Sequence, residues 1–364
     1  MKSLYPALPG DIDQKPIKKP SGRFRGPSLS RQGHCLPGRL EHRDRRPRAE
    51  RPGVRQQTET RVKAAIAELE KQQAGAMGSG RMLAIDIVME TPQRFSDAVR
   101  AAFEAEMAAF LPGVFRCRFH FAEVMKPAEL VQLLDRIRLR GTHGIVLKAP
   151  DVAEVAAAVA RADAAGIPVV TLVTDLPNSA RIAYAGADNR AAGETAAYLI
   201  GEFLGGDGGN VLVTLSSGRF RGEEEREIGF RRIIRAHYPD ISITEISEGH
   251  GSDRATGTLA SAALATDPAI NAVYSIGGGN RAVLAAFDVA SRPVRVFVAH
   301  DLDADNRALL AARRIDFVLH HDLRTDARSA FRAIISRATA PGRVVPASLS
   351  SVEIVTPYNM PAGD

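Results

Sequence analysis

Beyond residue 80, the chain alternates between two spacings of apolar residues. Short, mostly apolar runs predict β-strands, and longer stretches with apolar residues three or four positions apart, such as 96–110 and 151–166, predict α-helices. The strands are expected at 82–89, 114–121, 143–148, 168–173, 181–186, 210–215, 241–246, 272–276, 294–299, 316–321 and 351–355. Strands and helices that alternate this often predict right-handed crossovers and mostly parallel sheets with helices on both faces.

This α/β region is long enough for two cores. A region of about 280 residues exceeds the size of one ordinary core, so we expect two doubly wound lobes side by side. The two-lobed domain is predicted to span 81–357. Its first lobe is expected at about 81–184 and 322–340, and its second at about 185–320 and 343–357.

The first 80 residues follow no such alternation. Residues 1–53 hold eight of the 21 prolines and show no lasting periodicity, which predicts a disordered segment. Residues 54–73 place Val62, Ile66 and Leu69 on one stripe, as in a single amphipathic helix. Residues 74–80, AGAMGSG, are typical of a flexible linker.

The net charge of +6 is concentrated at the N-terminus. Residues 1–53 carry 13 Lys or Arg against 5 Asp or Glu, whereas residues 54–364 carry 35 against 37. The near-neutral body is therefore no nucleic-acid binder on charge. Nucleic-acid binding would therefore have to come from the basic segment 1–53, acting as a phosphate-binding arm. The alternative, which its composition favours, is that this segment is a solvated tail without such a role.

Cysteine content and hydropathy indicate the cellular compartment in which the protein is expected. The only cysteines, Cys35 and Cys117, lie in unlike regions, so a reducing compartment is expected rather than a disulfide framework. No apolar run approaches the length of a membrane span, and residues 1–20 lack the continuous apolar stretch of a secretory signal. We therefore expect a cytoplasmic protein without membrane contact.

The loops that follow the strands are the candidate ligand site. Doubly wound sheets bind ligands beyond the carboxyl ends of their strands, and the ends of two lobes can face each other across a cleft. The loops in question are 89–95, 173–177, 186–193, 216–230, 276–281, 299–307 and 320–326. Most carry charged or amide side chains, which a polyhydroxylated ligand would require once water is excluded.

Four motifs in these loops resemble a known family. YxGxDNxxAG at Tyr184 to Gly193, RxxGF at Arg226 to Phe230, GGGN at Gly277 to Asn280 and a strand ending in Asp301 are, in this order, similar to LacI (lactose-repressor) family regulators and ribose-like sugar-binding proteins. The resemblance covers roughly 81–357 and implies the type I periplasmic-binding fold.

The segment 51–69 resembles the last helix of the LacI DNA-binding headpiece. The helix-turn-helix that should precede it is missing, and the family's hinge helix is replaced by EKQQAGAMGSG. The resemblance implies an effector-binding transcription regulator that senses a sugar or similar polar molecule, forms a homodimer and binds operator DNA in the intact architecture. A solute-binding protein of a transport system is the alternative. An enzyme is not expected, because no catalytic arrangement or nucleotide fingerprint is present. No cofactor is expected either.

Arg226 and Asp301 are the first candidate ligand contacts. A guanidinium can donate two parallel hydrogen bonds to vicinal hydroxyls or a carboxylate, although Arg226 could instead pair with Glu223 or Glu225 on its own helix. The Asp301 carboxylate would accept bonds from hydroxyls, and Asp303 is the better candidate to cap the following helix. The resemblance implies ligand contacts for both Arg226 and Asp301.

Five further residues complete the predicted site. Asn280 follows three glycines that allow close backbone approach, unless it only caps a helix. Phe95 and Gln93 would offer a sugar an aromatic face and an amide, or Phe95 belongs to the core. The resemblance implies ligand contacts for Asp175, which could otherwise form a turn, and for His321, where relatives carry Gln.

No metal site is expected, because the neighbouring His320 and His321 point to opposite faces of a strand. Asp188 and Asn189 are predicted to cap the helix that follows them rather than to touch ligand.

The abrupt change in composition near residue 51 predicts that the upstream reading frame is shifted or that the gene start is rearranged. Translation of the encoding DNA in its other two frames is expected to reveal a helix-turn-helix before residue 51. If neither frame encodes one, the hypothesis is wrong.

Overall fold

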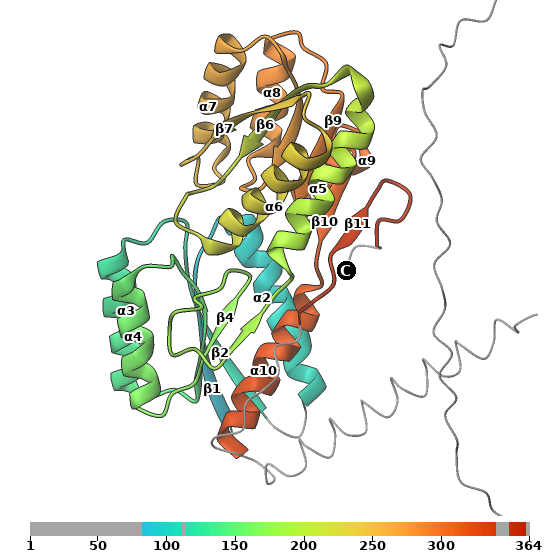
Figure 1. The fold of residues 1–364 in the computed structure, drawn as a ribbon. Helices are drawn as coiled ribbons and strands as arrows, with labels where there is room; N and C mark the ends of the chain where they lie inside the picture. The colour runs from blue at the N-terminus through green and yellow to red at the C-terminus, as the bar shows by residue number, and fades with distance from the viewer. Residues whose placement is uncertain (1–81, 111–113, 340–348, 362–364) are drawn as a thin grey trace, which may run out of the picture. The chain divides into compact units, whose positions relative to one another are not determined.

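The computed structural model describes residues 82–110, 114–339 and 349–361. The predictions for 1–53, 54–73 and 74–80 lie outside these residues. The predicted α/β fold class is confirmed, with helices on both faces of two mostly parallel sheets (Figure 1). None of the helices in the described ranges is long and apolar enough to cross a bilayer.

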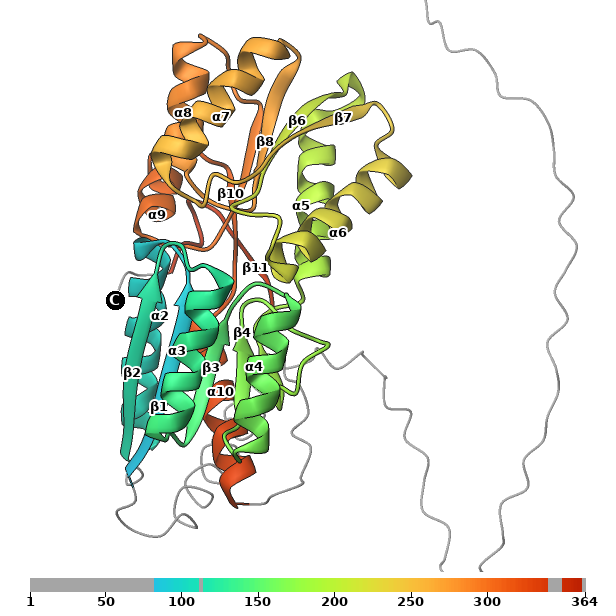
Figure 2. The same cartoon turned by 90° about the vertical axis from the view of Figure 1, so that its left-hand side faces the viewer.

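The first sheet contains five parallel strands in the order β2-β1-β3-β4-β5. They are β1 (Met82–Glu90), β2 (Val114–Ala122), β3 (Gly144–Lys148), β4 (Val169–Leu172) and β5 (Ala183–Ala185). One face packs on α2 (Gln93–Met107) and α10 (Leu323–Thr339), and the other on α3 (Pro127–Arg140) and α4 (Ala153–Ala164) (Figure 2). This sheet with its four helices is lobe 1.

The second sheet contains six strands in the order β11-β10-β9-β8-β6-β7. They are β6 (Gly209–Thr214), β7 (Ile241–Ile246), β8 (Ile270–Ser275), β9 (Val296–His300), β10 (Phe317–His320) and β11 (Glu353–Val355). All are parallel except β11, which runs antiparallel to β10. Helices α5 (Asn189–Leu204) and α6 (Arg221–His237) cover one face, and α7 (Asp253–Thr266), α8 (Asn280–Val289) and α9 (Ala304–Ala311) cover the other. This sheet with its five helices is lobe 2.

Helix α10 lies late in the chain but packs against elements from the first part of the described sequence. It follows β10 of lobe 2, yet it packs beside α2 in lobe 1. Its Phe331 stacks on Phe115 with ring centroids 4.4 Å apart and meets Phe103 edge to face at 5.3 Å. The chain therefore crosses between the lobes after β5 and after β10, and β11 belongs again to the sheet of lobe 2.

Helices α5 and α6 pack with their backbones almost in contact. A Cβ atom on Gly193 would lie 1.9 Å from the carbonyl oxygen of Arg226, and one on Gly229 would lie 2.2 Å from that of Arg190. Only glycine fits at such a distance, so the approach of the two helices depends on both glycines. Because Arg226 lies on α6, the same contact sets the position of this side chain.

We expect Gly193→Ala to lower the free energy of unfolding by about 1–3 kcal/mol, because the added methyl group forces α5 and α6 apart. Urea denaturation measures the change. Gly206→Ala is the control, since a Cβ atom there meets nothing within 4 Å, and it should stay within about 0.5 kcal/mol of the parent. Equal losses in both variants would contradict the packing argument.

Candidate functional site

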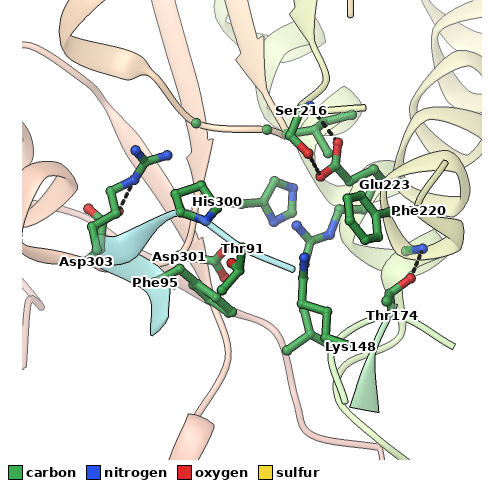
Figure 3. Close-up of a pocket in the computed structure, with 18 of the residues that line it drawn as sticks. Thr91, Phe95, Lys148, Thr174, Ser216, Phe220, Glu223, His300, Asp301 and Asp303 are labelled. Carbon is green, nitrogen blue, oxygen red and sulfur yellow. Dashed lines mark hydrogen bonds and ion pairs between the residues drawn. The ribbon is translucent and has the colours of Figure 1, made fainter. Parts of the chain in front are cut away.

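A partly enclosed cavity of about 70 Å³ lies between the carboxyl ends of the two sheets. Lobe 1 contributes Thr91, Pro92, Arg94, Phe95, Lys148, Val173 and Thr174, and lobe 2 contributes Ser216, Phe220, Gly222, Glu223, Arg226, Ile276, Gly277, Gly278, His300, Asp301, Asp303 and Asn306 (Figure 3). This is the place that doubly wound sheets offer a ligand. Two aromatic rings and several charged groups share its wall.

Arg226 is oriented by α5 rather than by its own helix. Its Nε donates to Asn189 Oδ1 at 2.8 Å, and only 5% of the residue is exposed. Asn189 is held in turn, since its Nδ2 donates to the Val173 carbonyl and to the Tyr184 hydroxyl at 3.1 Å. Among the described residues, neither Nη atom of Arg226 has a hydrogen-bond partner.

The expected alternative partners of Arg226 are engaged elsewhere. Glu223 accepts from the Ser216 amide at 2.7 Å and from the Ser216 hydroxyl. Glu225 pairs with Arg190 and Arg221, each at 2.7 Å. The ion pair within α6 that the sequence left open is therefore not formed, and the guanidinium faces the cavity.

Asp301 has a left-handed backbone, with φ of 64°. A residue with a side chain pays about 1–3 kcal/mol in strain for such a conformation, so the surroundings must hold it. Asn306 does so, because its Nδ2 donates at 2.8 Å to the carbonyls of His300 and Asp301. Behind it, Asn280 Nδ2 donates to Asn306 Oδ1 at 2.6 Å and Asn280 Oδ1 accepts from Ser275 at 2.5 Å.

His321 lies behind Asp301 and links it to lobe 1. Its Nδ1 is 2.6 Å from Asp326 Oδ2 on α10, and its Nε2 is 3.5 Å from Asp301 Oδ1. Burial alone would lower the pKa of His321, but the two carboxylates outweigh it and raise the pKa to about 9. The imidazole is therefore protonated at neutral pH.

The charge of Asp301 follows from the same contact. Burial would raise its pKa, but the contact with His321 and the charge of Arg226 hold the pKa well below the usual range. Asp301 is therefore ionised in the cavity wall, where 23% of its side chain is exposed.

Lys148 ends β3 in the cavity wall with 9% of the residue exposed. Its Nζ donates to the Glu90 carbonyl at 2.8 Å and lies 4.0 Å from the centroid of the Phe220 ring. Burial lowers the pKa of Lys148 to about 8, although the carboxylates of Glu223, Glu90 and Asp301 oppose this shift. In Figure 3 the lysine and Asp301 reach the cavity from different lobes.

The lobes also contact each other directly around the cavity. Arg94 Nε of lobe 1 pairs with Asp303 Oδ2 at 2.9 Å, and its Nη1 donates to the Gly251 carbonyl at 2.8 Å. Arg219 of lobe 2 donates to Glu90 Oε1 at 2.6 Å. Nearby, the Gly222 amide donates to Thr174 Oγ1 at 2.8 Å. These contacts connect the two lobes around the cavity.

The structure brings three of the seven predicted site residues into the cavity: Phe95, Arg226 and Asp301. Asn280 and His321 are buried outside the cavity lining, and each contacts a residue that does line it. Asn280 donates a hydrogen bond to Asn306, and His321 contacts Asp301. Asn280 is also not the helix cap that the sequence left open, because it begins α8 and Gly279 occupies the cap position.

Gln93 and Asp175 lie away from the cavity. Gln93 is exposed at the start of α2. Phe95, on the same helix, is buried. Asp175 accepts from Arg181 Nη2 at 2.6 Å, from the Thr171 hydroxyl at 2.7 Å and from the Leu176 amide at 2.8 Å, as expected of the turn-forming alternative. Asp188 and Asp303 cap α5 and α9 as predicted, whereas Asn189 orients Arg226.

The sequence pattern did not single out Lys148 or several other residues of the wall. Arg94, Ser216, Phe220 and Glu223 lie within the strand-end loops of the predicted site, but nothing in their local pattern distinguishes them from their neighbours. Lys148 did carry a signal, because a charged residue closes the otherwise apolar run GIVLK at the carboxyl end of a buried strand.

Solved structures with a similar fold include both binding proteins and a regulator. GanP, a glucose-galactose binding protein from Geobacillus stearothermophilus, has a TM-score of 0.69 at 20% identity, covering 78% of this chain and 100% of its own. A solute binding protein from Agrobacterium vitis bound with alpha-D-tagatopyranose has a TM-score of 0.68 at 19% identity, covering 76% and 95%.

A protein provisionally assigned as a LacI transcriptional regulator, from Bacteroides fragilis, has a TM-score of 0.65 at 12% identity, covering 77% of this chain and 98% of its own. Identities this low establish a shared fold and nothing finer.

Sequence families give a more specific result. No curated protein matches the chain significantly. The profile of the periplasmic binding protein domain family, however, matches residues 87–340, which include most of both lobes and all of the cavity wall. The chain belongs to the periplasmic binding protein domain family.

Proposed function

We propose that the cavity binds a sugar or a similar small polar molecule. The observation that carries the proposal is that Arg226 and Asp301 of lobe 2 and Phe95 of lobe 1 line one partly enclosed space. The two free Nη atoms of Arg226 donate to hydroxyl oxygens, and the ionised Asp301 accepts from hydroxyl hydrogens. Phe95 and Phe220 supply apolar faces for the carbon skeleton of a sugar ring.

Ligand binding in this proposal works through lobe closure. The ligand has contacts to both lobes only in the closed form, so it favours that form by its differential affinity. The interlobe pairs of Arg94 with Asp303 and of Arg219 with Glu90 add to the same form. His321 connects Asp301 to α10 and so couples the ligand to lobe 1.

We further propose that closure regulates transcription, with the chain acting as a cytoplasmic, homodimeric regulator of LacI type. The similarity of 51–69 to the last helix of the LacI headpiece supports this role, as does the order of the four loop motifs. Operator DNA is the partner in the intact architecture. The fold shared with the Bacteroides fragilis protein, which is provisionally assigned as a LacI regulator, is compatible with this role.

A binding protein of a sugar transport system is the second candidate. The glucose-galactose binding protein and the tagatose-bound protein among the similar structures favour it. Both candidates require the same ligand site, so they differ in what closure of the lobes controls.

In a thermal-shift screen of pentoses, hexoses, polyols and sugar acids, we expect at least one compound to raise the melting temperature of the full chain. A ligand at 100 times its dissociation constant adds about 2.7 kcal/mol of stability. Asp301→Asn should weaken binding at least tenfold, because a charge-assisted acceptor is lost.

The exposed Asp97→Asn is the matched control and should bind like the parent. Full affinity in the Asp301→Asn protein would remove the cavity from the explanation, and a screen without any stabilising compound would contradict ligand binding.

Transcription and uptake separate the two roles. We expect a chromosomal Asp301→Asn replacement to abolish the change that the sugar causes in transcripts of neighbouring genes. Uptake of the labelled sugar should stay unchanged when the transporter genes are expressed from a constitutive promoter. Reduced uptake with unaltered transcripts would instead establish the transport role.

A further inference from the structure

Two buried cations in the cavity wall have no carboxylate partner. Lys148 is 9% exposed and Arg226 is 5% exposed, and both line the cavity. Across the described ranges, neither forms an ion pair within 4.0 Å. Lys148 donates only to a backbone carbonyl and Arg226 only to an amide oxygen. Buried charges in proteins are ordinarily paired, so this arrangement requires an explanation.

The other cations around the cavity do have partners. Arg94 pairs with Asp303 at 2.9 Å, and Arg219 pairs with Glu90 at 2.6 Å. The lack of a partner is therefore specific to the two cations that reach the cavity from opposite lobes. Lys148 stands at the end of β3 in lobe 1, and Arg226 stands on α6 in lobe 2.

The carboxylates nearest to Lys148 are already engaged. Glu90 accepts from Arg219, and Glu223 accepts from the amide and hydroxyl of Ser216. Asp301 contacts the protonated His321. Burial accordingly dominates at Lys148 and lowers its pKa to about 8. An additional negative charge in the cavity would compensate this cost.

We propose that the ligand carries an oxyanion, a carboxylate or a phosphate, that contacts both Lys148 and Arg226. This inference rests on the proposed sugar-binding function and narrows the ligand to a sugar acid or a phosphorylated sugar. The planar guanidinium binds two oxygens of such a group at once, and the ammonium adds a second charge from the other lobe. Asp301 remains available for hydroxyl groups of the same ligand.

A bridging oxyanion also accounts for closure. In the open form Lys148 and Arg226 would belong to separated lobes, and in the closed form the two buried cations approach each other. Like charges brought together at low dielectric repel each other strongly. An anion between them converts this repulsion into two attractions, so the anionic ligand favours the closed form more strongly than a neutral ligand does.

Titration calorimetry of the full chain with matched ligands tests the inference. The pairs are D-galactose with D-galacturonate, D-glucose with D-glucuronate, and D-glucose with glucose 6-phosphate. We expect a charged member to bind at least tenfold more tightly than its neutral parent at pH 7. Comparison of the uronates with the phosphate tells which oxyanion the cavity takes.

Lys148→Met keeps the aliphatic stem and removes the charge, so it should weaken binding of the charged ligand at least tenfold more than it weakens binding of the neutral parent sugar. Arg254→Met, at an exposed position on α7, is the control and should change neither. Thermal unfolding without ligand verifies that the Lys148→Met protein is folded.

The pH dependence gives a second readout. Affinity for the charged ligand should fall as the pH rises from 7 to 9, because Lys148 loses its proton near pH 8. Glu223 and Arg226 of α6, Glu90 of β1 and Asp301 after β9 also act on Lys148. His321 titrates near pH 9 and acts on Asp301. The pH dependence of binding of the neutral parent sugar therefore measures the effect of His321, and the difference between the two ligands reports on Lys148.

Each outcome has a clear meaning. If the neutral sugars bind as tightly as their charged partners, or if Lys148→Met leaves the preference intact, the oxyanion is excluded and sugar binding stands. If only the neutral sugars bind, the oxyanion inference fails and the proposed sugar binding stands. If no compound of either kind binds, both the inference and the proposed function fail.

Discussion

The cost of burying charge where two sheets meet is the constraint on which the rest of this structure depends. The carboxyl ends of the two sheets bring strand-end loops together, and several charged side chains of these loops are largely buried there. A polar group in such a place must find a partner or lose several kcal/mol of hydration. The network from Ser275 through Asn280 and Asn306 to the backbone of Asp301 satisfies this requirement in lobe 2.

The positions of the charged groups follow from packing far from the cavity. Gly193 and Gly229 allow α5 and α6 to approach until the carbonyl of Arg226 would touch a methyl group. Asn189 then lies within reach of the Arg226 guanidinium. On the opposite side, Asp326 of α10 fixes His321, and His321 faces Asp301. Each charged side chain in the wall is thus held by an element other than its own.

The fold was predictable from sequence because its signals are local. Each predicted strand has a counterpart within the described ranges, since an apolar run bounded by turns needs no knowledge of its neighbours. The site was predictable in part. Arg226 and Asp301 follow from motif order, but whether a loop residue faces the cavity or stands behind it depends on rotation and on contacts distant in sequence.

Asp175 and Asn280 illustrate the limit. Both occupy loops at the right end of a sheet, yet Asp175 meets Arg181 within its own turn and Asn280 supports Asn306. Gln93 and His321 likewise lie outside the cavity lining, whereas Phe95 and Asp301 are part of it. Lys148 was missed because a single charge at a strand end carries no motif.

The return of α10 to lobe 1 has a consequence for biosynthesis. Phe331 completes an aromatic cluster with Phe103 and Phe115, residues made more than two hundred positions earlier. A ribosome therefore finishes strands β6 to β10 before the first-made lobe receives its last helix. Lobe 1 must wait on the ribosome with one face of its sheet incompletely covered, whereas the other lobe lacks only its short antiparallel edge strand.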